Sequence, residues 1–404
     1  MDQRSPSEAM VIDDPVYGKI YLPQDVAAIV ATPHFERLKK IKQLGFLYLD
    51  DVKEHTHNRY YHCIGTYHAA GLMLDALEKN TSWLSDNNNT IPPLFRQAVQ
   101  IAGLVHDIGH GPFSHSWEAV ADHYEHEKVG LPCVDEIFAC IDEKLFPELR
   151  ANNNYGICLI KALITGKMKK LHKLGFKLSS KFMFIFGIIC NKRNKLDVDK
   201  WDYLKRDKFY LKHLCNPTMD FDDIFLKAKV SDCGEYIEYR YNDFGKIHSL
   251  FAARWNNHRY CYQLPRNLMR DKILKLIVDE IKPKINGHLL KDIDAKNSMT
   301  AFLELTDENI LSLVEQHPLS IFLKYDAKFE EVKESSWQVE NWLFQTTIDI
   351  PSVTSYIQYD SFDFYGDAED KPDVIDETET IRHIIKFTCD ISNDKVFYYI
   401  KPVE

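Results

Sequence analysis

Hydrophobic residues in the first 260 positions recur at helical spacing, in several separate stretches. Apolar side chains three and four positions apart predict helices over 26–49, 61–77, 94–106, 113–126 and 196–209. Two prolines open the third stretch, and Gly109, Gly111 and Pro112 separate it from the fourth. A short apolar run at 182–190 is expected to be a buried segment. These patterns predict a mainly helical first part of the chain.

The pattern changes after about residue 300. Residues of alternating polarity predict strands over 341–350, 352–359, 381–390 and 395–402. Between them, residues 360–379 hold nine acidic residues and one lysine, which favours a solvated loop. We therefore expect a mainly α protein with two parts: a helical domain over 1–300 and a small C-terminal α+β lobe over 301–404.

Composition and charge limit the class of protein. With 45% hydrophobic and 27% charged residues, the 404-residue chain has an ordinary globular composition. The formal net charge of −10 argues against a broad nucleic-acid-binding face, although a compact basic pocket stays open. Nine dispersed cysteines without a C-x-x-C pair indicate reduced thiols. No apolar run approaches the ~20 residues of a membrane helix. We expect a soluble, intracellular protein in the cytoplasm, with a nuclear location also open and no membrane partner.

Histidine and aspartate cluster in three segments: HTHNRYYH from residue 55, HDIGHGPFSH from residue 106, and DVDKWDY from residue 197. A single adjacent His-Asp pair is more often structural than chemical. Here the glycine turns allow His106, His110 and His115 to approach one another, and imidazole and carboxylate are the usual ligands of Fe, Mn, Zn or Mg. Since one helix offers only one or two ligands to an ion, His62 and Asp199 are the candidates from other segments.

Asp199, Tyr203 and Asp207 follow one another at intervals of four residues, which places all three on one face of a predicted helix. Two carboxylates on that face suit a cleft. The alternative is a solvated face, with Trp201 and Leu204 on the buried side. Spacing alone leaves both interpretations open.

Several motifs together resemble a known family. The segments TPHFERLKKIKQLG, THNRYYHCIG, QIAGLVHDIGHGPFSHSWE, NKRNKLDVDKWDYLKRD and RWNNHRYCYQ are similar, in this order, to the HD-domain deoxynucleoside triphosphate triphosphohydrolases. The animal enzymes that couple a SAM domain to an HD domain are the most similar, and we expect no SAM domain in this chain. The resemblance covers about residues 11 to 270 and fades beyond 300. It implies a helical HD phosphohydrolase core.

The resemblance also implies roles for individual residues around a divalent metal ion, which could be Mn, Fe, Mg or Zn. The implied metal ligands are His62, His106, Asp107 and Asp199. His115 would be the general acid, oriented by Glu118, where the family usually has aspartate. The implied phosphate-contacting residues are Arg59, His110, His126, Lys200, Tyr203 and Arg254. Of these, His110, His126 and Arg59 also belong to the implied catalytic set.

A second implied group surrounds the sugar of the substrate. Gln43 and Asp207 would hold the 3′-hydroxyl group, while Leu44, Tyr203 and Tyr262 would form a wall that excludes ribonucleotides. His258 and Gln263 would line the same region. We accordingly expect hydrolysis of dNTP to deoxynucleoside and inorganic triphosphate, in a homo-oligomer. A histidine acid suits this reaction because its free pKa is about 6.5.

The family's guanine-nucleotide activator site departs from the expected pattern. Ala31, Glu36 and Lys39 stand where Asp, Gln and Arg are expected, and lysine lacks the planar fork of arginine. Met10 replaces a phosphate-binding lysine, and Asp13 replaces an asparagine. We predict that activation by guanine nucleotides is weakened or lost.

Two other functions stay open. The same centre could serve another HD phosphohydrolase or phosphodiesterase that acts on a nucleotide, cyclic dinucleotide or oligonucleotide. Alternatively, the chain could bind single-stranded nucleic acid, helped by the six lysines within 167–181, although an exposed surface segment is the favoured reading of that stretch. His55 and His57 are expected in a loop that covers the site.

Overall fold

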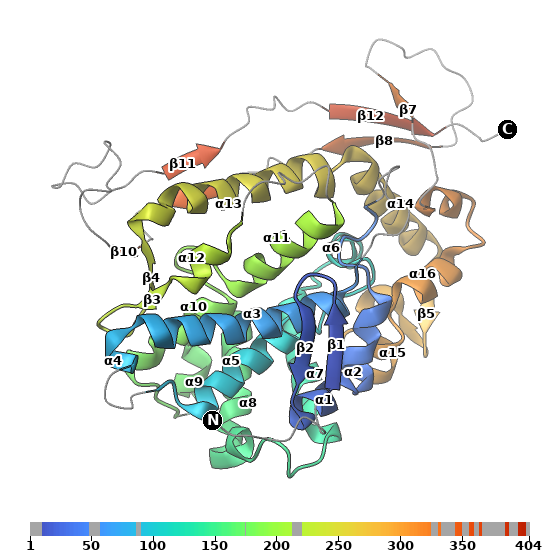
Figure 1. Cartoon of the computed structure of the whole chain (residues 1–404). Helices are drawn as coiled ribbons and strands as arrows, with labels where there is room; N and C mark the ends of the chain where they lie inside the picture. Colours follow the sequence, from blue (N-terminus) through green and yellow to red (C-terminus); the bar gives the residue numbers. More distant parts are fainter. Residues whose placement is uncertain are drawn as a thin grey trace.

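The structure is a computed structural model that describes residues 10–324, apart from 48–56, 86–89, 174 and 212–219, together with six short strands after residue 324. Helices account for most of the described residues (Figure 1), and the predicted mainly α fold class is confirmed. Within the described part of the chain, no helix combines the length and apolar character needed to cross a membrane.

Four helices pack against one another in the core: α3 (Arg59–Asn80), α5 (Pro93–Val105), α8 (Pro147–Thr165) and α11 (Val198–Tyr210). Figure 1 shows α3 crossing the middle of the molecule. Gly65 allows α11 to approach α3 closely, because a Cβ atom there would lie 1.9 Å from Oδ1 of Asp202. The helices predicted over 61–77, 94–106 and 196–209 are confirmed, with small shifts at their ends.

Two predicted helices are broken in the structure. The stretch 26–49 divides into α1 (Gln24–Val30), α2 (Pro33–Glu36) and η2 (Arg37–Lys40), because Pro33 lacks an N–H group and Thr32 caps a new helix by accepting a hydrogen bond from Phe35 N. The stretch 113–126 divides into α6 (His115–Val120) and the start of α7 (His126–Cys140). Left-handed backbone at His123, with φ of 69°, interrupts that helix.

Shorter elements surround the core. An antiparallel hairpin of β1 (Met10–Asp14) and β2 (Gly18–Leu22) precedes α1. The others are α4 (Ser82–Ser85), α9 (Lys169–Lys173), η4 (Ser180–Ile185), α10 (Phe186–Ile189), α12 (Asp222–Leu226), β3 (Lys229–Val230), β4 (Ile237–Arg240), η5 (Tyr241–Asp243), α13 (Phe244–Asn257), η6 (His258–Tyr262), α14 (Pro265–Ile281), β5 (Lys284–Ile285), β6 (His288–Leu289), η7 (Leu290–Asp292), α15 (Met299–Leu303), α16 (Asp307–Val314) and η8 (Pro318–Leu323). The run 182–190, expected to be buried, falls in η4 and α10, whose Phe184, Ile185, Ile188 and Ile189 are buried.

The strands after residue 324 are β7 (Glu330–Val332), β8 (Phe344–Asp349), β9 (Ser355–Gln358), β10 (Asp363–Tyr365), β11 (Ile384–Phe387) and β12 (Lys395–Ile400). β12 pairs antiparallel with β7 and β8, β11 pairs antiparallel with β9, and β10 pairs parallel with β4. The four predicted strands are confirmed. β10 lies inside the stretch 360–379 that was expected to be a loop, and the rest of that stretch is outside the described residues. The division at residue 300 stays a prediction.

Candidate active site

Four side chains from three helical segments converge at one point: His62 of α3, His106 and Asp107 at the end of α5, and Asp199 of α11. The His62 Nε2 atom lies 3.2 Å from His106 Nε2, 3.1 Å from Asp199 Oδ1 and 3.3 Å from Asp107 Oδ2. His106 Nε2 lies 3.4 Å from Asp107 Oδ1 and 3.5 Å from Asp199 Oδ1. Ligand atoms bonded at about 2.1 Å to one ion lie roughly 3.0–3.4 Å apart. The spacing and the His₂Asp₂ donor set therefore fit a divalent metal ion.

Each imidazole of this quartet is fixed through its other nitrogen. Asp202 accepts from His62 Nδ1 at 2.7 Å and is itself held by Arg206 at 2.9 and 3.0 Å. The Gly103 carbonyl accepts from His106 Nδ1 at 2.8 Å. Such partners orient a ligating histidine and fix its tautomer. Asp202 was not among the residues predicted from the sequence; its signal was its position one helical turn after Asp199.

The Asp107 carboxylate is ionised in this setting. Burial alone would raise its pKa, but the Arg59 guanidinium and the neighbouring histidines hold the pKa of Asp107 well below its usual range. Arg59 forms a close ion pair with Asp107 and donates from Nε to Ser114 Oγ at 2.9 Å. A charged, immobile carboxylate is what metal ligation requires.

A second cluster adjoins the quartet and contains His110, His115, Glu118 and His126. The Glu118 carboxylate accepts from His115 Nδ1 at 3.1 Å and from His126 Nδ1 at 2.5 Å. The rings of His110 and His126 stack at 3.8 Å, and His110 Nε2 lies 3.3 Å from Asp107 Oδ1. The His115 side chain is 69% exposed, whereas that of His110 is 1% exposed. Burial alone would raise the pKa of Glu118, but hydrogen bonds from His115 and His126 hold it below its usual value.

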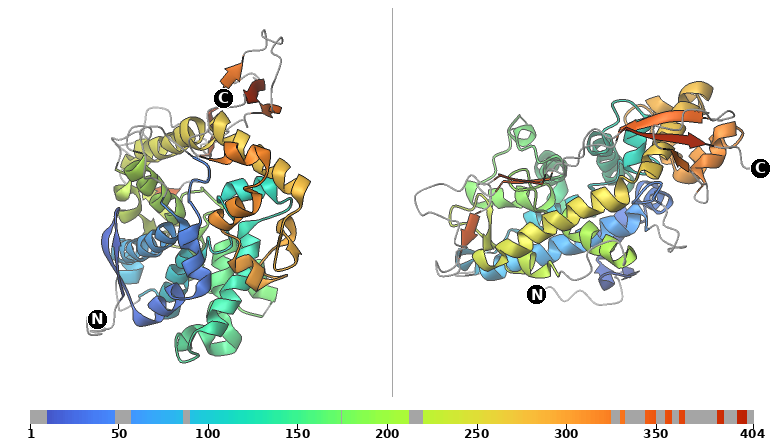
Figure 2. Two further views of the ribbon diagram at one scale, coloured as in Figure 1. Left: turned by 90° about the vertical axis from the view of Figure 1, so that its right-hand side faces the viewer. Right: turned by 90° about the horizontal axis from the view of Figure 1, so that it is seen from above.

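The backbone before His115 adopts an unusual conformation that a distant residue stabilises. Phe113 and Ser114 have φ values of 57° and 58°, in the left-handed region that ordinary residues avoid. Asp307 of α16 accepts from Phe113 N at 2.6 Å and from Lys42 N at 3.0 Å. In Figure 2 (left) the orange segment lies beside the segment that contains α6. Sequence reasoning missed Asp307, since no local pattern connects positions 194 residues apart.

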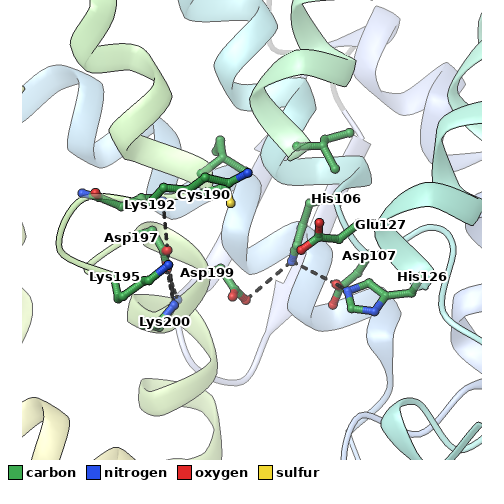
Figure 3. Close-up of a pocket in the computed structure, with 13 residues that line it drawn as sticks. His106, Asp107, His126, Glu127, Cys190, Lys192, Lys195, Asp197, Asp199 and Lys200 are labelled. Carbon is green, nitrogen blue, oxygen red and sulfur yellow. Dashed lines mark hydrogen bonds and ion pairs between the residues drawn. The ribbon is translucent and has the colours of Figure 1, made fainter. Parts of the chain in front are cut away.

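Two of the expected phosphate-contacting cations, Lys200 and Arg254, lie on α11 and α13, and a third, Arg59, begins α3. Lys200 pairs with Asp197 at 3.1 Å, and Arg254 donates from Nε to Tyr203 OH at 3.0 Å. Lys200 also lines a cavity of about 290 Å³ that it shares with His106, Asp107, His126 and Asp199. Figure 3 shows these side chains facing the cavity. The structure thus brings Lys200 and three of the four expected metal ligands to one opening.

The expected sugar-binding residues also meet, two helical turns further along α11. Tyr262 donates a short hydrogen bond to Asp207, while Leu44 and Tyr262 pack against a small apolar cluster. The His258 ring stands edge-on to Tyr262, at 5.0 Å between ring centroids. Gln263, which ends the π-helical turn η6, donates from its backbone N to the His258 carbonyl at 3.0 Å.

The structure corrects the expectation for His57. It was expected in a covering loop, but it is fully buried, stacked on Tyr210 at 4.7 Å, with Nε2 3.2 Å from Asp207 Oδ1. Its carbonyl accepts from Gln43 N at 2.9 Å, so His57 contacts both residues expected to hold the 3′-hydroxyl group. His55 lies outside the described residues.

Comparison with known proteins agrees with this geometry. Residues 59–157 match the model of the HD domain family. Residues 59–157 are therefore similar to an HD domain. The matched residues include His62, His106 and Asp107, together with the cluster of His115. Asp199 reaches the HD domain from α11, outside the matched residues.

The chain is also similar to curated deoxynucleoside triphosphate triphosphohydrolases named SAMHD1. It is 30% identical to the Xenopus laevis protein over 89% of this chain and 59% of the relative. It is 30% identical to the Homo sapiens protein over 82% of this chain and 53% of the relative, and 30% identical to a Dictyostelium discoideum homolog over 65% and 47%. The chain therefore spans about half the length of these relatives. The family resemblance seen in the motifs is confirmed.

Proposed function

We propose that this protein is a metal-dependent dNTP triphosphohydrolase. The observation that carries the proposal is the arrangement along α11, where Asp199 lies in the quartet and Asp207, two turns away, contacts Tyr262 and His57. In this proposal one helix connects the hydrolytic centre to the group of residues that would hold the deoxyribose. The names of the similar proteins support this substrate class.

The chain's own residues would prepare a triphosphate for cleavage. A triphosphate carries about four negative charges, so a partly buried site needs several cations and hydrogen-bond donors. Arg59, Lys200 and Arg254 supply them. A divalent ion held by the quartet would supply Lewis-acid activation of the phosphoryl group and of the attacking water. The metal could be Mn, Fe, Mg or Zn, since His/Asp sites accept several ions.

The bond that breaks in this proposal is the one between the α-phosphorus and O5′. Water attacks the α-phosphorus and its oxygen stays on the inorganic triphosphate, while His115 gives a proton to O5′ of the leaving deoxynucleoside. The exposure of His115 lets it reach the leaving group, while Glu118 fixes its ring. The longer glutamate, in place of the family's usual aspartate, still contacts both His115 and His126.

Sugar selection would rest on groups that already surround Asp207. Asp207 and Gln43 would hold the 3′-hydroxyl group, and a substrate without that group would leave buried acceptors unpaired. Leu44, Tyr203 and Tyr262 would form the wall beside C2′. His258 and Gln263 lie next to Tyr262 and would line the same pocket.

The direct test is incubation with each dNTP and NTP plus Mn²⁺ or Mg²⁺, with analysis of both products. We expect deoxynucleoside and triphosphate, with ribonucleotides cleaved at least ~10-fold more slowly. Asp199→Ala should abolish turnover, whereas Asp292→Ala, which changes an exposed carboxylate in η7, should not. Release of nucleoside monophosphate would favour another HD phosphohydrolase. Salt-sensitive oligonucleotide binding without turnover would favour a nucleic-acid-binding protein.

Activation by guanine nucleotides is expected to be weak or absent. Lys39 is paired with Glu36 at 2.7 Å and lies over the Tyr60 ring at 4.6 Å, so its ammonium group already has partners. Ala31 and Asp13 are exposed, and neither side chain favours guanine or phosphate. GTP should change dNTP turnover by less than ~2-fold. A purified protein that forms an oligomer and becomes active only with GTP would contradict this prediction. Light scattering on the same samples measures the oligomeric state and so tests the expected homo-oligomer.

A further inference from the structure

The cavity beside the metal-binding quartet extends past the start of α11. Its lining includes Lys192 and Lys195 in the turn before α11, in addition to Lys200. Figure 3 places Lys195 beside Asp197 and Lys200 on one side of the cavity. Neither Lys192 nor Lys195 belongs to the phosphate-contacting residues considered above.

The turn that carries Lys195 is built by two asparagines. Asn191 Oδ1 accepts from Arg193 N at 3.1 Å and from Asn194 N at 3.2 Å, and Asn194 Oδ1 accepts from Leu196 N at 3.0 Å. This turn holds Lys195 at a φ of 64°, in the left-handed region that is unfavourable for lysine. Backbone strain of this kind concentrates where a side chain serves a ligand.

Lys195 differs from the other two lysines of the cavity. Lys192 donates to the Thr165 carbonyl at 2.5 Å, and Lys200 pairs with Asp197. Among the described residues, the Lys195 ammonium group makes no hydrogen bond and no ion pair, so it is free to bind an anion. Four carboxylates, those of Asp107, Glu127, Asp197 and Asp199, face the three lysines. The carboxylates outnumber the lysines, so the net charge of the cavity lining is negative. A divalent ion on the quartet would make this net charge positive, and anion binding should therefore require the metal.

The position of Lys195 fits the end of a phosphate chain. Asp207 and Asp199 are eight residues apart on α11, which corresponds to about 12 Å along the helix. If the sugar lies at Asp207 and the α-phosphate near Asp199, as the proposed function holds, the next phosphates extend toward the start of α11. The positive end of that helix dipole and Lys195 are both located there.

We propose that Lys195 binds the terminal phosphate group of the substrate and makes this site select triphosphates over shorter phosphate chains. The inference rests on the proposed function for the direction of the substrate. It assigns chain-length selection to a turn that precedes α11 and lies outside the HD domain match.

The test measures binding of inorganic triphosphate, pyrophosphate and phosphate to the Mn²⁺-loaded protein by calorimetry. Lys195→Ala should weaken triphosphate binding about 10-fold and phosphate binding less than 2-fold, as expected when one charge-assisted contact is lost. Lys144→Ala removes an exposed lysine away from the cavity and is the matched control. In wild-type protein, EDTA should remove triphosphate binding.

Lys195→Gly separates charge from backbone strain. Glycine accepts the left-handed conformation, so this variant should melt about 2 °C higher than Lys195→Ala and yet bind triphosphate as weakly. Unchanged triphosphate affinity in both variants, or an equal loss for all three anions, would overturn the proposal. Binding is measured without turnover, so Lys195-dependent triphosphate binding in a protein that does not cleave dNTP would refute the proposed function alone.

Discussion

The metal-binding quartet and the neighbouring cluster around His115 contain similar side chains in different settings. His62 and Asp107 are buried, and each is held by a further partner, Asp202 for the first and Arg59 for the second. His115 is mostly exposed, and Glu118 is the partner of its ring nitrogen Nδ1. A group that ligates an ion has to be immobile and ionised, whereas a group that gives up a proton has to reach the leaving atom.

This difference assigns binding of the ion to the quartet and proton transfer to the cluster around His115. Substitutions in the quartet should remove the metal and all activity together. Substitutions around His115 should leave the metal bound and slow only the reaction. The variants of His115, Glu118 and Asp202 test whether the two clusters can be separated in this way.

The largest effect on the second cluster is expected for His115→Ala. Loss of a general acid should lower kcat for dNTP by about 10²–10⁴-fold with little change in KM. Glu118→Gln should lower kcat less, and Glu118→Asp should keep most activity, because aspartate still offers a carboxylate. Steady-state kinetics at saturating metal checks all three variants. A His115→Ala enzyme with full kcat would exclude the assigned acid.

An intermediate effect is expected for Asp202→Asn. Asparagine preserves the shape but weakens the hydrogen bond that orients His62, so metal affinity should fall about 10–100-fold. Titration of the apo-protein with Mn²⁺ measures this, and excess metal should restore most of the dNTP turnover. Failure of excess metal to restore turnover would mean that Asp202 acts on chemistry and not on the ion.

The smallest effect concerns Asp307, which stabilises the strained turn before His115. Burial raises the pKa of Asp307 to about 6, above its ordinary value of 3.8. The folded state therefore holds this proton more tightly than the unfolded state, and the free energy of unfolding falls as pH rises through the window between the two values. Between pH 5 and 7 the free energy of unfolding of the wild-type protein should fall by about 1 kcal/mol. The Asp307→Asn variant should not show this decrease. Urea unfolding of both proteins at the two pH values checks this; parallel curves would contradict the assignment.

Local patterns of the sequence were sufficient for the core helices. The set of four metal ligands was implied by the family resemblance of HDIGHGPFSH and DVDKWDY, and binding of a metal by these residues stays a prediction. The breaks at Pro33 and His123 were missed because apolar spacing continues across them. Asp307 and the buried position of His57 depend on contacts between distant segments, which no periodicity in the sequence records.

The metal content of purified variants tests the central claim most directly. Elemental analysis by mass spectrometry after metal loading and desalting should find one divalent ion per chain in the wild-type protein and in His115→Ala, and none in Asp199→Ala. An ion retained at full occupancy in Asp199→Ala would contradict the account, because the ion would then not be held by the four side chains that converge from α3, α5 and α11.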